Sequence, residues 1–401
     1  MRARAFGAWP RRRLLLRTVA SVAQTGAQAA SVVVSLLAVH FAGIATWGAF
    51  LGAMILVRLC AQVANFGTRD HLLGEFARDP GYMRAAWRRN VAARASLLVL
   101  GPLVFLAAGA DLPRAVAMTA WLVGLFIAQS YDSVVTYRRA FAVAFWLEVG
   151  GTGLIAGLIV LRGAALTADD LILSFALVAA LRAAALAVRF PSFRPIIGLP
   201  DIPELRRAWS FFMLTFSGAV QGRVDLYVVA VLLPPADLGA YGVLTNFVLL
   251  TQSLSGALLA PVVPLLYRLS RAAVWRSALR LFAMGVPVTL AAAALTLVCL
   301  ELLYGIHLSP LTITAAWAAM LPPFLFTPLV YYQFRRRRAR LVVYGSLLGA
   351  GVSIAGTLTL APGLGIAGAM VSAALAQAGI AAFHVVLVWR LASERNVTSE
   401  T

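Results

Sequence analysis

The stretch from Trp47 to Arg69, WGAFLGAMILVRLCAQVANFGTR, is long and apolar enough to cross a bilayer, yet it carries Arg58 near its middle. A charged side chain at mid-membrane is costly, so such residues usually face protein or water rather than lipid. Gln62, Asn65 and Arg69 follow Arg58 at spacings of four, three and four, which places all four on one side of a helix. The sequence therefore predicts a membrane helix whose polar face lines a cavity.

The composition extends this prediction to the whole chain. Of 401 residues, 61% are hydrophobic and 12% are charged, and the mean hydropathy of +0.87 is far above that of soluble domains. The net charge of +19 would suit a nucleic-acid partner, but no polar domain concentrates it. Cys60 and Cys299 both fall in apolar spans, which argues against a disulfide framework and against a metal site. We expect an all-α polytopic membrane protein.

Charged residues, prolines and glycines divide the chain into about twelve transmembrane segments. Prolines predict bent or broken helices in the eighth segment, at Pro261 and Pro264, and in the tenth, at Pro322, Pro323 and Pro328. The segments are expected near residues 14–42, 46–68, 91–109, 114–137, 140–161, 169–189, 207–233, 238–267, 276–300, 310–333, 340–360 and 365–390.

The distribution of arginine predicts the orientation of these segments. Cytoplasmic connections are enriched in Arg and Lys, and nearly all arginines of this chain fall in alternate connections. The other set of connections contains only Arg114 and Arg162. The basic N-terminus resembles a cleavable signal, but Arg17 interrupts its apolar stretch, so we interpret it as an uncleaved first helix. Both termini are expected in the cytoplasm.

A short internal repeat suggests two halves in the same orientation. Residues 45–50 read ATWGAF and residues 236–241 read ADLGAY, and each lies where the second segment of its half begins. Parallel repeats of this kind are a transporter architecture with a site between the halves. We predict an N-terminal six-helix lobe at 1–190, a proline-rich cytoplasmic linker at 191–206 and a C-terminal six-helix lobe at 207–401.

Polar stripes on the predicted helices identify candidate cavity residues. Arg58 is the first of them, and Leu249 stands at its repeat-related position in the second half, so Arg223 on the seventh segment is the expected counterpart. Helical phase places Arg223 opposite Asp225. Small polar residues on such stripes could instead join helices by hydrogen bonds. The predicted substrate-binding residues are Arg58, Arg223, Gln24, Gln28, Gln62, Asn65, Gln221 and Gln252.

Three carboxylates lie within predicted segments, at Glu148, Asp132 and Asp225. They are candidates for coupling transport to a gradient of H⁺ or Na⁺. For Glu148 and Asp132, the alternative is ion pairing with Arg138 or Arg139. No cofactor is expected beyond such a coupling ion.

No catalytic constellation is recognisable in the sequence. The four histidines, at positions 40, 71, 307 and 384, are scattered, and neither a P-loop nor a nucleophile motif is present. We therefore predict that the protein is not an enzyme.

The chain resembles the multidrug/oligosaccharidyl-lipid/polysaccharide (MOP) flippase superfamily, especially Wzx-type polysaccharide flippases. The resemblance rests on twelve segments in two lobes, a basic loop after the second segment, and the D-L-G-x-Y element at Asp237 to Tyr241 that follows a segment with Asp225. It implies a MATE-like fold and alternating access, with an undecaprenyl-diphosphate-linked oligosaccharide moved across the bacterial cytoplasmic membrane. Arginines in the cavity would suit the diphosphate.

Two other functions remain open from the sequence. An ion-coupled antiporter for drugs or organic cations would share the fold, although no acid occurs in the first, second or eighth segment. A membrane scaffold of a polysaccharide assembly complex would transport nothing. The expected partners are the lipid-linked oligosaccharide, membrane lipids, and a polysaccharide polymerase and glycosyltransferases.

Overall fold

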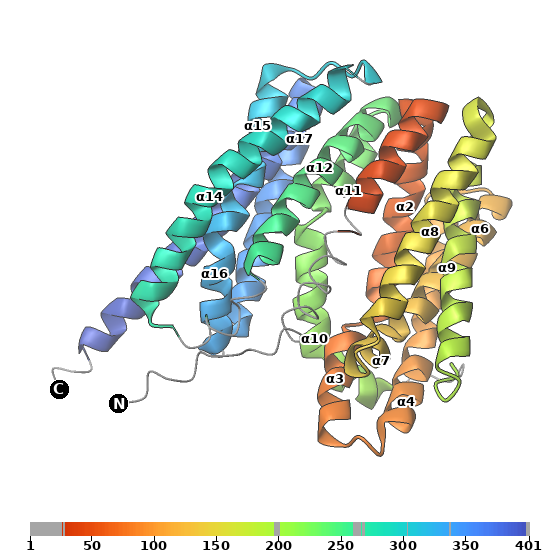
Figure 1. Ribbon diagram of the computed structural model, residues 1–401, viewed down its shortest axis with the longest axis horizontal. Helices are drawn as coiled ribbons and strands as arrows, with labels where there is room; N and C mark the ends of the chain where they lie inside the picture. Colours follow the sequence, from red (N-terminus) through yellow and green to blue (C-terminus); the bar gives the residue numbers. More distant parts are fainter. Residues whose placement is uncertain are drawn as a thin grey trace. The chain divides into compact units, whose positions relative to one another are not determined.

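The structure is a computed structural model that describes residues 26, 29–195, 201–259, 266, 269–302, 304–336 and 338–397. Regular structure in these residues is entirely helical (Figure 1). Nine of the helices in this part of the chain are long and apolar enough to cross a membrane, and a shorter apolar helix covers Ala29–Ala42. The chain is therefore a multi-pass, all-α membrane protein. The count of twelve segments and the cytoplasmic location of both termini stay predictions.

Internal contacts divide the chain into two compact units. The N-terminal unit is Val34–Gly242, and the C-terminal unit is Val243–Thr401 together with Met1–Val33. The predicted lobes at 1–190 and 207–401, with their linker at 191–206, stay a prediction.

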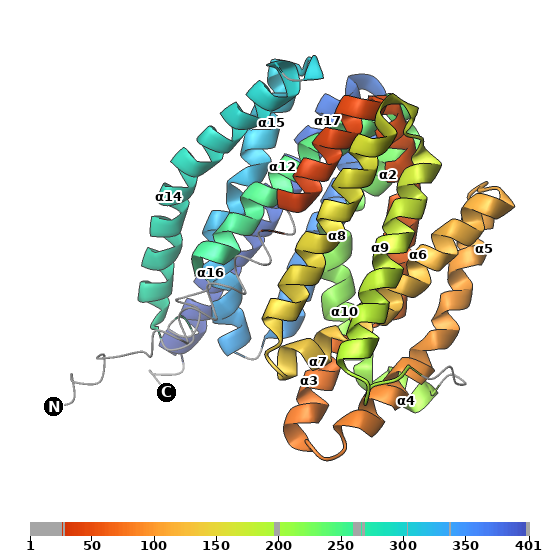
Figure 2. The same cartoon turned by 45° about the vertical axis from the view of Figure 1, so that its right-hand side comes forward.

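In the N-terminal unit, α6 packs along α9, and both contact α2. Figure 2 shows α8 beside α9 in the same unit. Aromatic rings join three of these helices. The centre of the Trp121 ring of α6 lies 5.8 Å from that of Phe50 of α2 and 5.2 Å from that of Phe175 of α9. The unit comprises α2 (Ile44–Asn65), α3 (Thr68–Arg78), α4 (Met83–Ala95), η1 (Ser96–Val99), α5 (Leu100–Ala107), α6 (Leu112–Ser130), α7 (Asp132–Tyr137), α8 (Phe141–Arg162), η2 (Gly163–Ala165), α9 (Ala168–Arg189), α10 (Ile202–Gln221), α11 (Val224–Leu232) and the first turns of α12 (Pro235–Leu259).

The second helix is shorter than the sequence suggests. α2 ends at Asn65, because Phe66 and Gly67 both adopt left-handed backbone angles, with φ of 49° and 66°. A Cβ on Gly67 would lie 2.5 Å from the backbone of Phe211 in α10, so glycine is required there. The predicted stripe from Arg58 therefore stops at Asn65, and its extension to Arg69 is wrong, since Arg69 belongs to the separate helix α3.

The two copies of the internal repeat meet in the N-terminal unit. A Cβ on Gly48 of α2 would lie 1.7 Å from the carbonyl oxygen of Pro235, and a Cβ on Gly239 of α12 would lie 2.2 Å from the carbonyl oxygen of Ile44. The two helices therefore touch backbone to backbone at their N-terminal ends, which requires a residue without a side chain on both sides.

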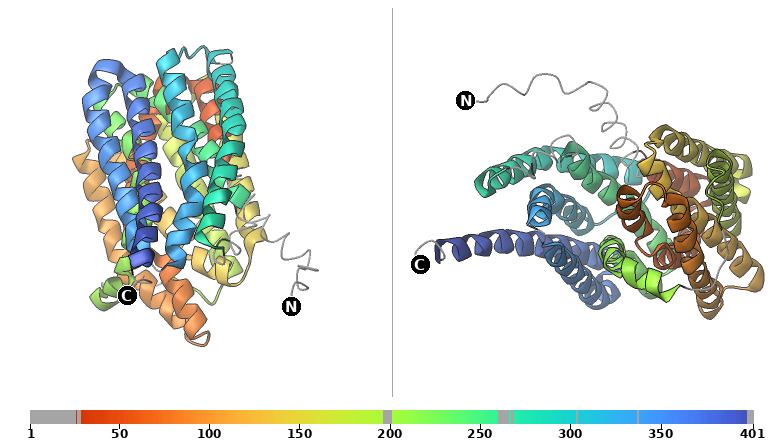
Figure 3. Two further views of the ribbon diagram at one scale, coloured as in Figure 1. Left: turned by 90° about the vertical axis from the view of Figure 1, so that its left-hand side faces the viewer. Right: turned by 90° about the horizontal axis from the view of Figure 1, so that it is seen from below.

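The C-terminal unit contains the rest of α12, α14 (Arg271–Leu297), a single π-helical turn η3 (Val298–Leu302), α15 (Pro310–Met320), α16 (Pro322–Arg335) and α17 (Ala339–Val397). Helices α14 to α17 pack side by side (Figure 3). The predicted break in the tenth segment is confirmed, because α15 ends at Met320 and α16 begins at Pro322. Pro261 and Pro264 lie outside the described residues.

α17 is a helical hairpin rather than one straight helix. Gly365 leaves helical geometry, with φ 58° and ψ −134°. The two halves then contact each other, since the Ser372 hydroxyl donates to the carbonyl oxygen of Ser353 at 2.8 Å. These halves correspond to the predicted segments at 340–360 and 365–390.

Candidate functional site

Arg58 lies in the middle of α2 with an exposed side chain, although its neighbours Val57 and Cys60 are buried. The residues next to Arg58 are apolar, as in ILVRLC at 55–60, so the helix does not need Arg58 in order to form. The structure thus places at mid-helix a guanidinium whose side chain is not covered by the described residues. A group of this kind requires a water-lined surface in a membrane protein.

Arg223 lies at a break in the seventh predicted segment. α10 ends at Gln221 and α11 begins at Val224, with Arg223 between them at φ −149°. The prediction that helical phase places Arg223 opposite Asp225 is therefore wrong, because the helical phase does not continue across the break. Gly222 is the sequence feature that could have indicated it.

The break brings Arg223 into the neighbourhood of Arg58. The two arginines lie close enough for their positive charges to repel each other, and the Tyr227 side chain of α11 interacts electrostatically with both. Within the described residues, neither arginine forms an ion pair with a carboxylate. Two unpaired cations that repel each other create a local site with affinity for anions.

The predicted coupling carboxylates Glu148 and Asp132 lie near a third arginine. Glu148 of α8 forms an ion pair with Arg182 of α9. The alternative pairing of Glu148 with Arg138 or Arg139 is therefore wrong. Asp132 interacts electrostatically with Arg182 and with Arg69. Arg182 thus pairs directly with Glu148, and its charge acts on Asp132 at longer range.

Asp225 has a different environment in the first turn of α11. It is buried, and the hydroxyl of buried Tyr241 donates a hydrogen bond to its carboxylate. A carboxylate in the first turn is also favoured by the helix dipole. Asp225 of α11 and Tyr241, the tyrosine of the D-L-G-x-Y element, thus join α11 to α12.

The remaining predicted cavity residues have mixed positions. Gln62 and Gln221 are half-buried. The carbonyl oxygen of Asn65 accepts a hydrogen bond from Arg94, while its buried side-chain Oδ1 has no partner among the described residues. In the C-terminal unit, Gln252 donates to the carbonyl oxygen of Ala319 at 2.9 Å. Gln24 and Gln28 lie outside the described residues.

Arg94 is a buried arginine that the sequence reasoning missed. Its guanidinium donates to the carbonyl oxygen of Ala64 at 3.0 Å, to Asn90 Oδ1 at 2.8 Å and to Ser130 Oγ at 3.0 Å. It also lies 4.9 Å from the centre of the Phe126 ring. Arg94 therefore satisfies the free carbonyl at the end of α2 and ties it to α4 and α6. In the sequence Arg94 follows closely on Arg84, Arg88 and Arg89, so nothing distinguishes it from the arginines of a basic loop.

Glu204 of α10 forms a second buried network, which the sequence did not indicate either. Its side chain is 1% exposed and contacts His71 Nε2 at 2.9 Å, Arg89 Nε at 3.1 Å and Asn90 Nδ2 at 3.3 Å. Burial acts to raise the pKa of Glu204. The hydrogen bonds from His71 and Asn90 and the charge of Arg89 outweigh burial, so the pKa falls to about 2.

Comparisons with known proteins concern the fold. No family model matches the sequence, and no curated protein matches it. The structure is similar to that of a lipid II flippase MurJ in an inward closed conformation, with a TM-score of 0.72, 12% identity, and coverage of 92% of this chain and 87% of that chain. An inward-facing multidrug resistance MATE transporter of the MOP superfamily gives a TM-score of 0.59 at 13% identity, with coverage of 96% and 99%.

A eukaryotic MATE transporter, AtDTX14, gives a TM-score of 0.50 at 12% identity, with 93% of each chain covered. At such identities the likeness is one of architecture. The chain therefore has the helical fold shared by lipid II flippase MurJ and the MATE transporters, both members of the MOP superfamily.

Proposed function

We propose that this protein is a flippase that moves an anionic, lipid-linked oligosaccharide across a bacterial cytoplasmic membrane by alternating access. The substrate class is an oligosaccharide on undecaprenyl diphosphate, as in Wzx-type flippases. One observation carries the proposal: Arg58 and Arg223 lie near each other, and among the described residues neither forms a direct ion pair with a carboxylate, although Glu148 and Asp225 act on them at longer range. A diphosphate would neutralise both charges at once.

Two neighbouring guanidinium groups suit a diphosphate better than a single carboxylate. A guanidinium forms paired hydrogen bonds with phosphate oxygens, and each such charge-assisted bond is stronger than a neutral one. Tyr227 interacts electrostatically with both cations, and in this proposal its hydroxyl would bind the same diphosphate. In this proposal Gln62, Gln221 and Asn65 would contact the glycan, and the substrate-binding roles of Gln24, Gln28 and Gln252 stay predictions from the sequence.

The test uses a bacterial strain whose own polysaccharide flippase is deleted and whose surface polysaccharide depends on this protein. Arg58→Gln and Arg223→Gln remove charge while keeping side-chain length. Loss of one charge-assisted contact costs about 1.5–3 kcal/mol, so each variant should transport about tenfold to a hundredfold more slowly. Arg276→Gln, which changes an exposed arginine of α14, is the matched control.

Normal surface polysaccharide in the Arg58→Gln/Arg223→Gln double variant, at wild-type expression, would refute the proposal. Transport of a fluorescent undecaprenyl-diphosphate oligosaccharide in proteoliposomes gives a direct second measurement. A parallel assay with a pH or Na⁺ gradient tests whether Glu148, Asp132 or Asp225 couples the movement to an ion.

A cation or drug antiporter is the second candidate. The chain shares its fold with a MATE transporter, and Asp225 is a buried acid within that fold. That function predicts efflux of cationic dyes that depends on Asp225 and is insensitive to Arg58→Gln. The scaffold alternative predicts that every charge in the membrane can be neutralised without loss of polysaccharide, while a polymerase or glycosyltransferase still co-purifies.

A further inference from the structure

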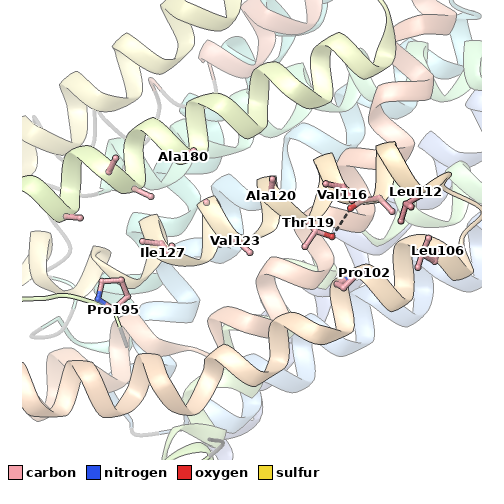
Figure 4. Close-up of a pocket in the computed structure, with 15 residues that line it drawn as sticks. Pro102, Leu106, Leu112, Val116, Thr119, Ala120, Val123, Ile127, Ala180 and Pro195 are labelled. Atoms are coloured by element: carbon pink, nitrogen blue, oxygen red, sulfur yellow. Dashed lines mark hydrogen bonds between the residues drawn. The ribbon is translucent and has the colours of Figure 1, made fainter. Parts of the chain in front are cut away.

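A long apolar groove lies on the N-terminal unit, between α5, α6 and α9 (Figure 4). Its volume is about 760 Å³, within the range of small-molecule sites. Pro102 and Leu106 of α5 line one end, and Pro195, which follows α9, lines the other. On α6 the lining runs from Leu112 to Ile127, which corresponds to about 22 Å of helix. This length is most of the hydrocarbon thickness of a bilayer.

The groove offers no polar contact to a ligand. Among the described residues that line it, Thr119 alone has a polar side-chain atom. That hydroxyl donates to the carbonyl oxygen of Ala115 within its own helix at 2.7 Å. Alanines form much of the floor, including Ala120 of α6 and Ala184 of α9. A hydrocarbon chain fits such a surface, whereas a polar solute or water would lose its hydrogen bonds there.

The groove is separate from the proposed transport site. The Trp121 ring of α6 packs on Phe50 of α2, the helix that carries Arg58. Val116, Val123 and Ile127, which line the groove, lie on the side of α6 away from Trp121. Helix α6 therefore stands between the groove and α2, so the groove does not share a wall with Arg58.

Two exposed arginines belong to the segments beside the Pro195 end of the groove. Arg194 directly precedes Pro195, and Arg88 directly follows Trp87 in α4. The rings of Phe193 and Trp87 contact each other, with centroids 5.6 Å apart, which fixes the two arginine-bearing segments side by side. Phe193 is fully buried, and its carbonyl oxygen accepts a hydrogen bond from the Tyr131 hydroxyl.

Both arginines are exposed, and neither forms an ion pair in the part of the chain that the structure describes. Arg89, the neighbour of Arg88, is in contrast committed to Glu204. The Pro195 end of the groove is thus flanked by two segments that each carry one of these arginines. Basic residues in such a position attract anionic lipid headgroups.

We propose that this groove is a binding site for an anionic glycerophospholipid. One acyl chain lies along α6 between α5 and α9, and the phosphate lies between Arg88 and Arg194. The proposal concerns a bound lipid distinct from the transported substrate, and it does not depend on the proposed function.

The test measures lipid retained by the purified full-length protein with native mass spectrometry. Phosphatidylglycerol and phosphatidylcholine with identical acyl chains are added in equal amounts. We expect phosphatidylglycerol to be retained at least about tenfold more, since each arginine near a headgroup contributes measurably to binding. The Arg88→Ala/Arg194→Ala variant should bind the two lipids equally. Arg276→Ala/Arg280→Ala, on exposed arginines of α14, should keep the preference.

A second variant tests the acyl chain. Ala120→Phe fills the groove and should reduce retention of both lipids at this site, whereas Ala291→Phe on the exposed face of α14 should not. Equal retention of both lipids by the wild type, or unchanged retention in Ala120→Phe, would show ordinary boundary lipid only and overturn the proposal. Gel filtration and thermal unfolding of each variant confirm that the comparison is between folded proteins.

Discussion

Gly48 and Gly239 lie against each other's helices, so that α2 and α12 meet through their backbones in the N-terminal unit. The same two glycines occupy the fourth position of the six-residue repeats at 45–50 and 236–241. The repeat that the sequence shows as a faint similarity is therefore a pair of matching contact surfaces. Small residues permit such close helix approach in membrane proteins.

Gly48→Ala should destabilise the protein, because its Cβ would overlap the carbonyl oxygen of Pro235 and the helices would have to separate. Overpacking of this kind costs about 1–3 kcal/mol. Gly52→Ala on the same helix is the matched control, since a Cβ there has open space and the better helix propensity of alanine should be neutral or stabilising. Thermal unfolding in detergent measures both, and equal midpoints for the two variants would contradict the contact.

Arg94→Lys should also destabilise the protein despite keeping the charge. A lysine ammonium cannot reproduce the guanidinium hydrogen bonds to Ala64, Asn90 and Ser130. Each buried acceptor left unsatisfied costs about 1–3 kcal/mol. Arg84→Lys, at an exposed position on the same helix, should have little effect. Protease sensitivity between α2 and α3 provides a local readout, and similar digestion of both variants would argue against the role of Arg94.

Glu204 predicts a specific pH dependence of stability. The pKa of Glu204 in the folded protein is about 2, below the value of about 4.3 for an unfolded chain. Its ionised form is therefore favoured by folding, so its contribution is complete above about pH 4.3 and is lost as the pH falls from there towards 2.

Glu204→Gln should remove that part of the dependence and lower stability at neutral pH, since Arg89 loses its buried partner. Breaking a buried ion pair costs about 3–5 kcal/mol. Glu75→Gln, which disrupts the exposed pair with Arg78, is the control and should change stability little. Unfolding midpoints between pH 7 and pH 3 give the comparison. Parallel curves for the wild type and Glu204→Gln would show that Glu204 does not titrate in this way.

Variants at the hydrogen bond between Tyr241 and Asp225 can distinguish a structural role of Asp225 from an ion-coupling role. Tyr241→Phe removes the donor and leaves the buried carboxylate without it, at a cost of about 1–3 kcal/mol. If Asp225 is structural, Asp225→Asn should be nearly as stable as the wild type and should transport normally, because an amide still accepts the Tyr241 hydrogen bond. Transport abolished in a stable Asp225→Asn variant would instead support coupling. Both measurements use the same purified protein.

Much of the fold was predictable from the sequence because membrane helices are long and apolar. The span predicted at 140–161 corresponds to α8, and the break at Pro322 follows from proline chemistry. The breaks at Phe66–Gly67 and at Gly222–Arg223 were not predicted. A single glycine in an apolar segment is compatible with a continuous helix, and tertiary contacts with α10 decide the first of these breaks.

The candidate site was predictable only where a residue type is itself anomalous. Arg58 stands out because a guanidinium in an apolar segment is costly in a membrane. The structure places Arg223 near it. The partner of Glu148 could not be read from spacing, because Arg182 lies 34 residues away and meets it only through the packing of α8 on α9. Arg94 and Glu204 were hidden for the opposite reason, since they lie among residues where charges are ordinary.

The backbone contact between Gly48 and Gly239 has a mechanical consequence. Repulsion between atoms rises steeply once they are in van der Waals contact, and here the contacting atoms belong to the two backbones. No side chain at either glycine interlocks with the opposite helix or loses rotamer freedom there. The contact therefore sets the shortest distance to which α2 and α12 can approach each other at their N-terminal ends.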